Sequence, residues 1–137
     1  MPITPAQLAM LKKAARQAAG RAYAPYSRFR VGAAILTESG KVFAGCNVEN
    51  ASYGLCNCAE RTAIFSAVAA GERKLRLKCV LVFTPTTKAT APCGACRQVI
   101  FEFGPKARVI STCRSRDRQD HLITDLLPNA FGPADLA

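Results

Sequence analysis

The spacing of apolar residues along the chain predicts that helices and strands alternate. A first helix begins at Pro5, because Thr4 and Gln7 have the spacing of a capping box and proline suits the first helical position. This alanine-rich helix runs to about Arg21. Four of its apolar side chains fall on one face, namely Leu8, Leu11, Ala15 and Ala18. Such a face is typical of a helix that packs against a core.

Four segments are typical of strands. Residues 30–37 and 41–48 are separated by residues 38–40, whose sequence Glu-Ser-Gly favours a hairpin turn. Residues 78–84 form an apolar run of the kind found in buried strands, and residues 107–112 predict another strand.

Two further helices are predicted between and after these strands. Residues 58–70 are followed by Gly71, and residues 94–103 are followed by Gly104, so each helix has a glycine where its C-terminal cap belongs. Near the C-terminus we expect a short helix over residues 121–127. This order of elements predicts an α/β sandwich, in which helices cover one mixed sheet.

Composition limits the class of protein. The chain has 137 residues, of which 50% are hydrophobic and 20% charged, so it fits one globular domain over residues 1–137 and neither a disordered chain nor a coiled coil. No apolar run approaches the roughly 18 residues of a membrane span. The first residues lack the pattern of a signal peptide, and we expect a cytoplasmic protein without a membrane partner.

The net charge is +10, from 19 basic and 9 acidic residues. Such an excess is compatible with an anionic partner such as nucleic acid. Part of it lies in two stretches, residues 72–78 and 106–120, which are typical of solvated surfaces. We therefore expect no nucleic-acid partner.

Seven cysteines need an explanation, and they are Cys46, Cys56, Cys58, Cys79, Cys93, Cys96 and Cys113. An odd number without a secretion signal argues against a disulfide framework. Cys46, Cys79 and Cys113 stand alone among strand-forming residues, where a cysteine commonly serves as a small buried hydrophobe. The two close groups, residues 56–58 and 93–96, favour metal binding or catalysis.

The strongest chemical pattern combines Cys58-Ala59-Glu60 with the segment Pro92-Cys93-Gly94-Ala95-Cys96. Three thiolates suit a zinc ion whose fourth position stays open to water, and all three lie at predicted helix starts, where the helix dipole stabilises thiolates. Glu60 is two residues from a ligand and is placed to move protons without binding the metal. The alternative is a closed, structural zinc site in which Cys56 is the fourth ligand.

The chain resembles the cytidine deaminases in their small, homotetrameric, three-cysteine form. Five stretches carry the resemblance, in the order found in that family and over nearly the whole chain. They are residues 26–34 (YSRFRVGAA), 45–54 (GCNVENASYG), 57–63 (NCAERTA), 92–99 (PCGACRQV) and 126–133 (LLPNAFGP).

This resemblance implies a three-layer α/β/α sandwich with a mixed sheet, and the hydrolytic deamination of cytidine and 2′-deoxycytidine in pyrimidine salvage. It implies one Zn²⁺ per chain on Cys58, Cys93 and Cys96, with Glu60 as the catalytic acid and base. Arg61 matches an arginine that donates hydrogen bonds to the thiolates and offsets their charge. The partners implied are a nucleoside substrate and three further copies of the chain.

The resemblance also assigns residues to substrate binding. Asn47 and Glu49 match the pair that binds the ribose 3′-hydroxyl, and Phe29 matches a residue that packs against the base. The other matching positions are Ala59, and Ala51, Tyr53 and Phe131, of which the last three reach a neighbouring subunit's site.

Some alternatives stay open. Cys56 departs from the family pattern, and Arg97 and Gln98 receive no role. Competing functions are a binding module with a structural zinc, a deaminase of a modified nucleoside antibiotic, and a polynucleotide deaminase.

Overall fold

A computed structural model describes residues 2–137 and contains a five-stranded mixed sheet of order β2-β1-β3-β4-β5. The strands are β1 Gly32–Thr37, β2 Val42–Cys46, β3 Leu77–Phe83, β4 Arg108–Thr112 and β5 Arg118–Leu122. The pair β3 and β4 is parallel, and the other neighbours are antiparallel. The predicted hairpin joins β1 to β2, and Gly40 adopts a positive φ of 93° in its turn.

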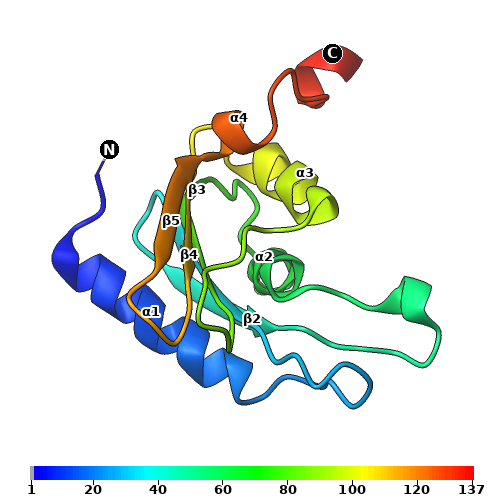
Figure 1. Ribbon diagram of the computed structural model, residues 1–137. Helices are drawn as coiled ribbons and strands as arrows, with labels where there is room; N and C mark the ends of the chain where they lie inside the picture. Colours follow the sequence, from blue (N-terminus) through cyan, green and yellow to red (C-terminus); the bar gives the residue numbers. More distant parts are fainter. Residues whose placement is uncertain (1) are drawn as a thin grey trace.

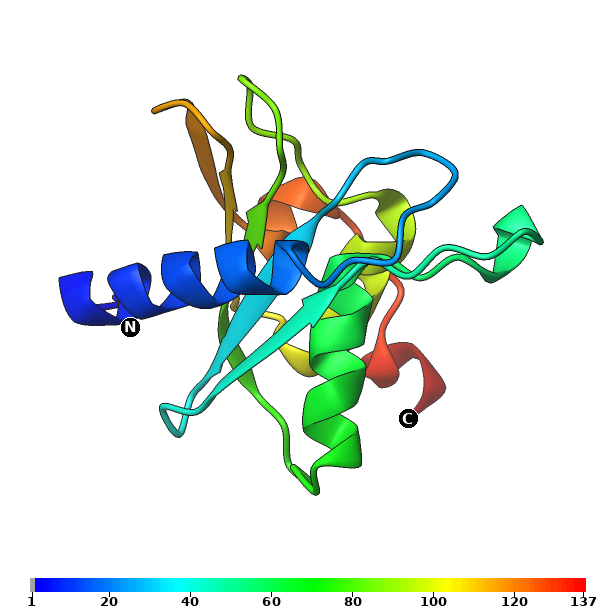
Figure 2. The same cartoon turned by 90° about the horizontal axis from the view of Figure 1, so that it is seen from below.

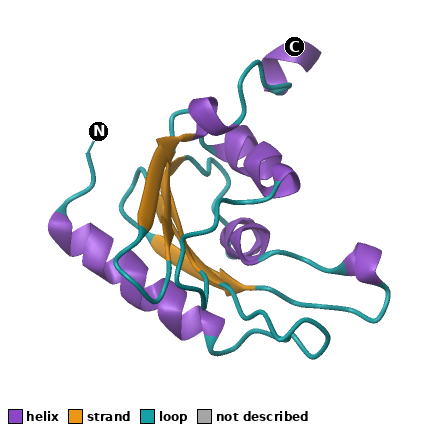
Figure 3. Ribbon diagram, in the orientation of Figure 1, coloured by secondary structure: helices purple, strands orange, loops and turns teal. Residues whose placement is uncertain are grey.

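Helices cover both faces of the sheet (Figures 1 and 3). Helix α1 lies on one face, whereas α2, α3 and α4 lie on the other. Their bounds are α1 Pro5–Ala19, α2 Ala59–Ala69, α3 Gly94–Phe103 and α4 Ile123–Leu126, with short 3₁₀ turns at Tyr53–Leu55 and Pro133–Leu136. The expectation of a three-layer α/β/α sandwich with a mixed sheet is confirmed. The capping box also forms, because Thr4 Oγ1 accepts from the Gln7 amide and Gln7 Oε1 accepts from the Thr4 amide.

The core has one apolar cluster on each face of the sheet. Helix α1 contributes Leu11 to the cluster that contains Leu81 of β3, and α2 contributes Ile64 to the cluster that contains Val80. No helix among residues 2–137 is long and apolar enough to cross a membrane.

Two helices approach the sheet so closely that only glycine fits beneath them. A Cβ atom on Gly32 of β1 would lie 1.8 Å from the carbonyl oxygen of Ala15 in α1. On the opposite face, a Cβ on Gly45 of β2 would lie 2.3 Å from the amide nitrogen of Ala63 in α2. The start of α2 is therefore held against β2 by contact between backbones.

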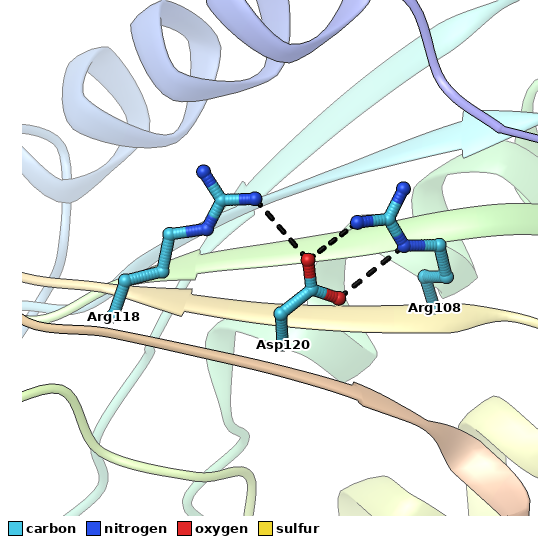
Figure 4. Close-up of polar contacts among 3 residues, drawn as sticks. All are labelled: Arg108, Arg118 and Asp120. Carbon is cyan, nitrogen blue, oxygen red and sulfur yellow. Dashed lines mark hydrogen bonds and ion pairs between the residues drawn. The ribbon is translucent and has the colours of Figure 1, made fainter.

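Strand β5 was not predicted from the sequence, and the predicted helix over residues 121–127 is shorter than expected. β5 is an edge strand whose side chains are mostly exposed, so it carries charges in place of an apolar pattern. Asp120 of β5 accepts hydrogen bonds from Arg108 of β4 and from Arg118 (Figure 4). The pair with Arg108 joins the edge strand β5 to β4, whereas the pair with Arg118 lies within β5.

Residues 47–57, which we call the arm, project from the body of the fold (Figures 1 and 2). Val48 and Asn57 exchange two backbone hydrogen bonds of 2.9 Å, which pair the two sides of the arm. The 3₁₀ turn forms the tip, where the Tyr53 and Leu55 side chains are 73% and 70% exposed. The arm thus presents apolar side chains away from the core of its own chain.

Candidate active site

The starts of two helices bring three cysteines together. Cys58 is the N-cap of α2, Cys93 is the N-cap of α3, and Cys96 lies in the first turn of α3. Their Sγ atoms all lie within 4.8 Å of one another, which defines the cysteine cluster. Neither cap side chain forms a capping hydrogen bond, so both sulfur atoms are available to a metal. The positive ends of both helix dipoles favour negative charge at this point.

The surroundings of the cluster favour a thiolate. A hydrogen bond from Cys96, followed by bonds from Arg61 and Cys93, lowers the pKa of Cys58 to about 5 against the opposing effect of burial. Arg61 Nη2 donates to Cys58 Sγ at 3.3 Å. Because Cys96 donates to this thiolate, its own pKa is raised. Arg61 Nε is buried without a hydrogen-bond partner among the residues described, so this guanidinium has a further donor besides Nη2, which already binds Cys58 Sγ.

The geometry of the cluster fits zinc. With Zn–S bonds of about 2.3 Å in a tetrahedron, two sulfur ligands lie about 3.8 Å apart. The Sγ atoms of Cys58 and Cys93 are 3.7 Å apart. Cys56 lies outside the cluster, and its sulfur accepts instead from the amide of Asn50 at 3.4 Å. Among the residues described, the structure therefore groups three cysteines and leaves Cys56 apart, which fits a three-cysteine zinc site better than the closed four-cysteine site.

Glu60 is buried beside the cysteine cluster. It is the second residue of α2 and is only 5% exposed. Burial raises the pKa of its carboxyl group to about 7, with a further contribution from the Cys58 thiolate. A carboxyl group that titrates near neutral pH can both accept and donate a proton under physiological conditions.

A hollow of about 220 Å³ lies in front of Glu60 and the cysteines. Its lining residues are Phe29, Val31, Asn47, Cys58, Ala59, Glu60, Val82, Thr84, Thr90, Ala91 and Cys93. This volume is below the usual 300–1,000 Å³ of ligand pockets, which suits a small flat ring. Three residues that the resemblance assigns to substrate binding line the hollow, namely Phe29, Asn47 and Ala59. Thr84 and Thr90 were not predicted from the sequence, although Thr90 lies only three residues before Cys93.

The predicted sugar-binding pair does not share this hollow. Asn47 lines it, whereas Glu49 lines a second hollow of about 290 Å³ together with Tyr53 and Cys56. Hydrogen bonds from the Ser27 side chain, the Ser27 amide and the Tyr26 amide lower the pKa of Glu49.

Asn47 is equally engaged within the chain. Its Oδ1 accepts from the Val31 amide at 2.9 Å, and its Nδ2 donates to the Phe29 carbonyl at 2.7 Å. The Glu49 carboxylate accepts from the amides of Tyr26 and Ser27. Asn47 and Glu49 together therefore hold residues 26–31 in place, and this positions Phe29 at the hollow. This positioning role was not foreseen from the sequence.

Three predicted substrate residues lie away from the hollow. Ala51 and Tyr53 are exposed on the arm, and Phe131 near the C-terminus is 58% exposed. None of the three lines the hollow at the cysteine cluster of its own chain. Their role at a neighbouring subunit stays a prediction.

Comparisons with known proteins agree with this geometry. Residues 5–112 match the family described as the cytidine and deoxycytidylate deaminase zinc-binding region. A curated cytidine deaminase from Halalkalibacterium halodurans is 48% identical over 128 residues, which are 93% of this chain and 96% of that protein. One from Mycobacterium tuberculosis is 45% identical over 93% of this chain and 91% of its own length.

Solved structures show the same similarity. The crystal structure of cytidine deaminase from Burkholderia pseudomallei superposes with a TM-score of 0.86 at 54% sequence identity, covering 94% of this chain and all of that one (100%). The match covers nearly the whole length of both chains. By its sequence, its fold and its three-cysteine site, this chain belongs to the cytidine and deoxycytidylate deaminase family.

Proposed function

We propose that the protein catalyses the hydrolytic deamination of cytidine and 2′-deoxycytidine to uridine and 2′-deoxyuridine, with release of ammonia, in pyrimidine salvage. The observation that carries this proposal is the buried Glu60 beside three convergent cysteines, two of which, Cys58 and Cys93, line the same small hollow as Glu60. The relatives named above bear the name cytidine deaminase.

Cys58, Cys93 and Cys96 would hold one Zn²⁺ per chain. When bound, zinc supplies a Lewis acid that lowers the pKa of water to about 7. Three thiolates and one Zn²⁺ have a formal charge of −1, which weakens this acidity. Arg61 offsets the charge by donating to Cys58 Sγ, and this is the role we assign to it.

Glu60 carries the protons of the reaction. It accepts a proton from the attacking water as the water oxygen adds to C4 of the pyrimidine, and it delivers that proton to N3. It then accepts the remaining proton of the added hydroxyl and delivers it to the amino group, which departs from C4 as ammonia. Water and cytidine thus become uridine and ammonia, and Glu60 returns to its initial state.

Substrate recognition is divided between two hollows. We assign the base to the hollow at the cysteine cluster, where Phe29 supplies a flat apolar surface. Asn47 and Glu49 are proposed to bind the ribose 3′-hydroxyl. This is compatible with their internal hydrogen bonds, because a carboxylate has about four acceptor positions and an amide can donate twice.

We propose that the active species is a homotetramer in which Ala51, Tyr53 and Phe131 complete a neighbour's site. The exposed apolar side chains of the arm support this, as do Phe65 and Val68 of α2, each 46% exposed. None of the seven cysteines is in a disulfide, which fits a reducing compartment, and we place the enzyme in the cytoplasm.

An absorbance assay of cytidine turnover, with zinc counted per chain, tests the proposal. Cytidine, 2′-deoxycytidine and deoxycytidylate are compared at equal concentrations, and we expect the two nucleosides to be deaminated. If protein with one zinc per chain releases ammonia from none of the three substrates, the proposed activity is wrong and the alternative of a binding module with a structural zinc is favoured.

Sedimentation across a dilution series tests the assembly separately. We expect activity to fall as the tetramer dissociates, because each site borrows residues from a neighbour. A fully active monomer would overturn the roles of Tyr53 and Phe131 but leave the chemistry at Glu60 in place.

A further inference from the structure

The Arg97 side chain binds the backbone of the loop that leads to Cys93, one of the proposed zinc ligands. Arg97 follows Cys96 directly in α3, and its Nε donates to the carbonyl oxygen of Pro92 at 2.8 Å. Its backbone amide donates to the carbonyl oxygen of Cys93 at 3.0 Å. The second bond belongs to the backbone of α3 and would form with any residue except proline, so the arginine side chain itself holds the carbonyl group of Pro92, immediately before Cys93.

The same guanidinium also reaches the C-terminal part of the chain. Arg97 Nη1 donates to the carbonyl oxygen of Leu126, the last residue of α4, at 2.9 Å. Helix α4 packs against α3 (Figure 1). A single half-buried side chain thus links the loop before Cys93 to the end of α4.

Residues 127–137, which we call the tail, continue along α3. Gln98 Nε2 donates to the Phe131 carbonyl oxygen at 2.7 Å. Farther along α3, a Cβ on Gly132 would lie 2.6 Å from Cε2 of Phe101, so the tail backbone packs directly on that ring. Arg97, Gln98 and Phe101 therefore contact the chain in order from Leu126 to Gly132.

Cys93 needs such support more than the other two ligands do. It is exposed, whereas Cys96 is buried and Cys58 is half-buried. As the N-cap of α3 it has no side-chain capping bond, so the direction of its Sγ depends on the backbone at residues 92 and 93. That backbone is the part Arg97 holds.

We propose that Arg97 is a positioning residue that couples the Cys93 ligand to the tail, and that Gln98 anchors the tail alone. Within residues 2–137 the Arg97 side chain donates to carbonyl oxygens and not to sulfur, so it acts through the backbone, whereas Arg61 acts on the thiolates. This inference rests on the zinc site of the proposed function. It adds that one side chain holds both the loop before Cys93 and Leu126, the residue from which the tail starts.

The test compares Arg97→Met, Arg97→Lys and Gln98→Met with the control Arg116→Met. These residues have similar helix propensities, so α3 should persist in the first three variants. Arg116 is an exposed arginine remote in sequence from α3. Two quantities are measured on the zinc-loaded protein: the rate of zinc transfer to an excess of a coloured chelator, and hydrogen exchange of the tail amides by mass spectrometry.

We expect Arg97→Met to release zinc about tenfold faster, the lower end of the effect of groups that orient metal ligands. Tail exchange should also be faster in this variant. Arg97→Lys should behave similarly, because one ammonium group cannot span both carbonyls in the fixed geometry of a guanidinium. Gln98→Met should accelerate tail exchange and leave zinc release at the wild-type rate.

Three results would overturn the coupling. Wild-type zinc release in Arg97→Lys would mean that positive charge alone matters. Equal zinc release in Arg97→Met and Arg116→Met would mean that the loop needs no clamp. Fast zinc release in Gln98→Met would mean that the tail, and not Arg97, supports Cys93. Wild-type protein that binds no zinc would instead refute the proposed function, while tail exchange would still report on the anchor.

Discussion

Replacing Asn47 by alanine should destabilise the protein, because its side chain fastens residues 29–31. Each of its two hydrogen bonds contributes about 0.5–1.5 kcal/mol, and a buried amide left without an acceptor costs about 1–3 kcal/mol. The Val31 amide is the buried partner, whereas the bond to the Phe29 carbonyl lies at the surface, where water can replace it. We therefore expect Asn47→Ala to lower the free energy of unfolding by about 2–3 kcal/mol.

Urea unfolding measures this loss, at one fixed subunit concentration because association makes stability depend on concentration. Asn50→Ala is the matched control. Among the residues described, the Asn50 side chain accepts one hydrogen bond, from the Ser52 amide on the exposed arm, so we expect a loss below about 0.5 kcal/mol. Asn47→Asp keeps the acceptor for Val31 and loses the donor, so about 1 kcal/mol should disappear. A loss in Asn47→Ala no larger than in Asn50→Ala would refute the positioning role.

Three further outcomes are expected. Glu60→Gln should keep zinc and fold but lose about 10²–10⁴-fold in turnover, because glutamine cannot carry a proton; near-normal turnover would remove Glu60 from the reaction. Metal analysis should find zinc in Cys56→Ala and none in Cys58→Ala, whereas loss in both would restore the four-cysteine site. Hydrogen bonds from the flanking arginines outweigh burial and lower the pKa of Asp120, so its ionised form contributes stability that is lost as pH falls through that pKa. The stability gap between wild type and Asp120→Asn should therefore narrow from pH 7 to about pH 3 in urea unfolding, and a constant gap would contradict this.

The metal site could be predicted because its signals are local. Cys93 and Cys96 lie one helical turn apart, and Glu60 lies two residues from Cys58, so short-range spacing groups these residues in two pairs. That the two pairs meet, 35 residues apart, was expected from the resemblance to the family, and the structure brings the three cysteines together. The helices and the first four strands follow from periodicity for the same reason. The burial of Glu60 could not be predicted in this way. Burial raises the pKa of its carboxyl group to about 7, and residue spacing carries no information about burial.

The remaining features depend on contacts that residue types do not encode. Glu49 and Asn47 bind backbone amides and a carbonyl of residues 26–31, and every residue other than proline offers these groups. Arg97 likewise finds carbonyl oxygens from two distant segments. Strand β5 is stabilised by its neighbour and by the ion pairs at Asp120, so its charged sequence lacks the alternation of a half-buried strand.

The close contacts at Gly32 and Gly45 limit how far amino-acid substitutions in the core can move the helices during evolution. Where helices rest on a sheet through bulky side chains, a substitution in the core shifts the helix by whatever the new side chain requires. Here α2 meets β2 through backbone at Gly45, one residue along the ladder from the partner of Gly32. Sequence drift among the surrounding aliphatic residues can therefore proceed with little displacement of Glu60, while the two glycines themselves have almost no accessible substitutions.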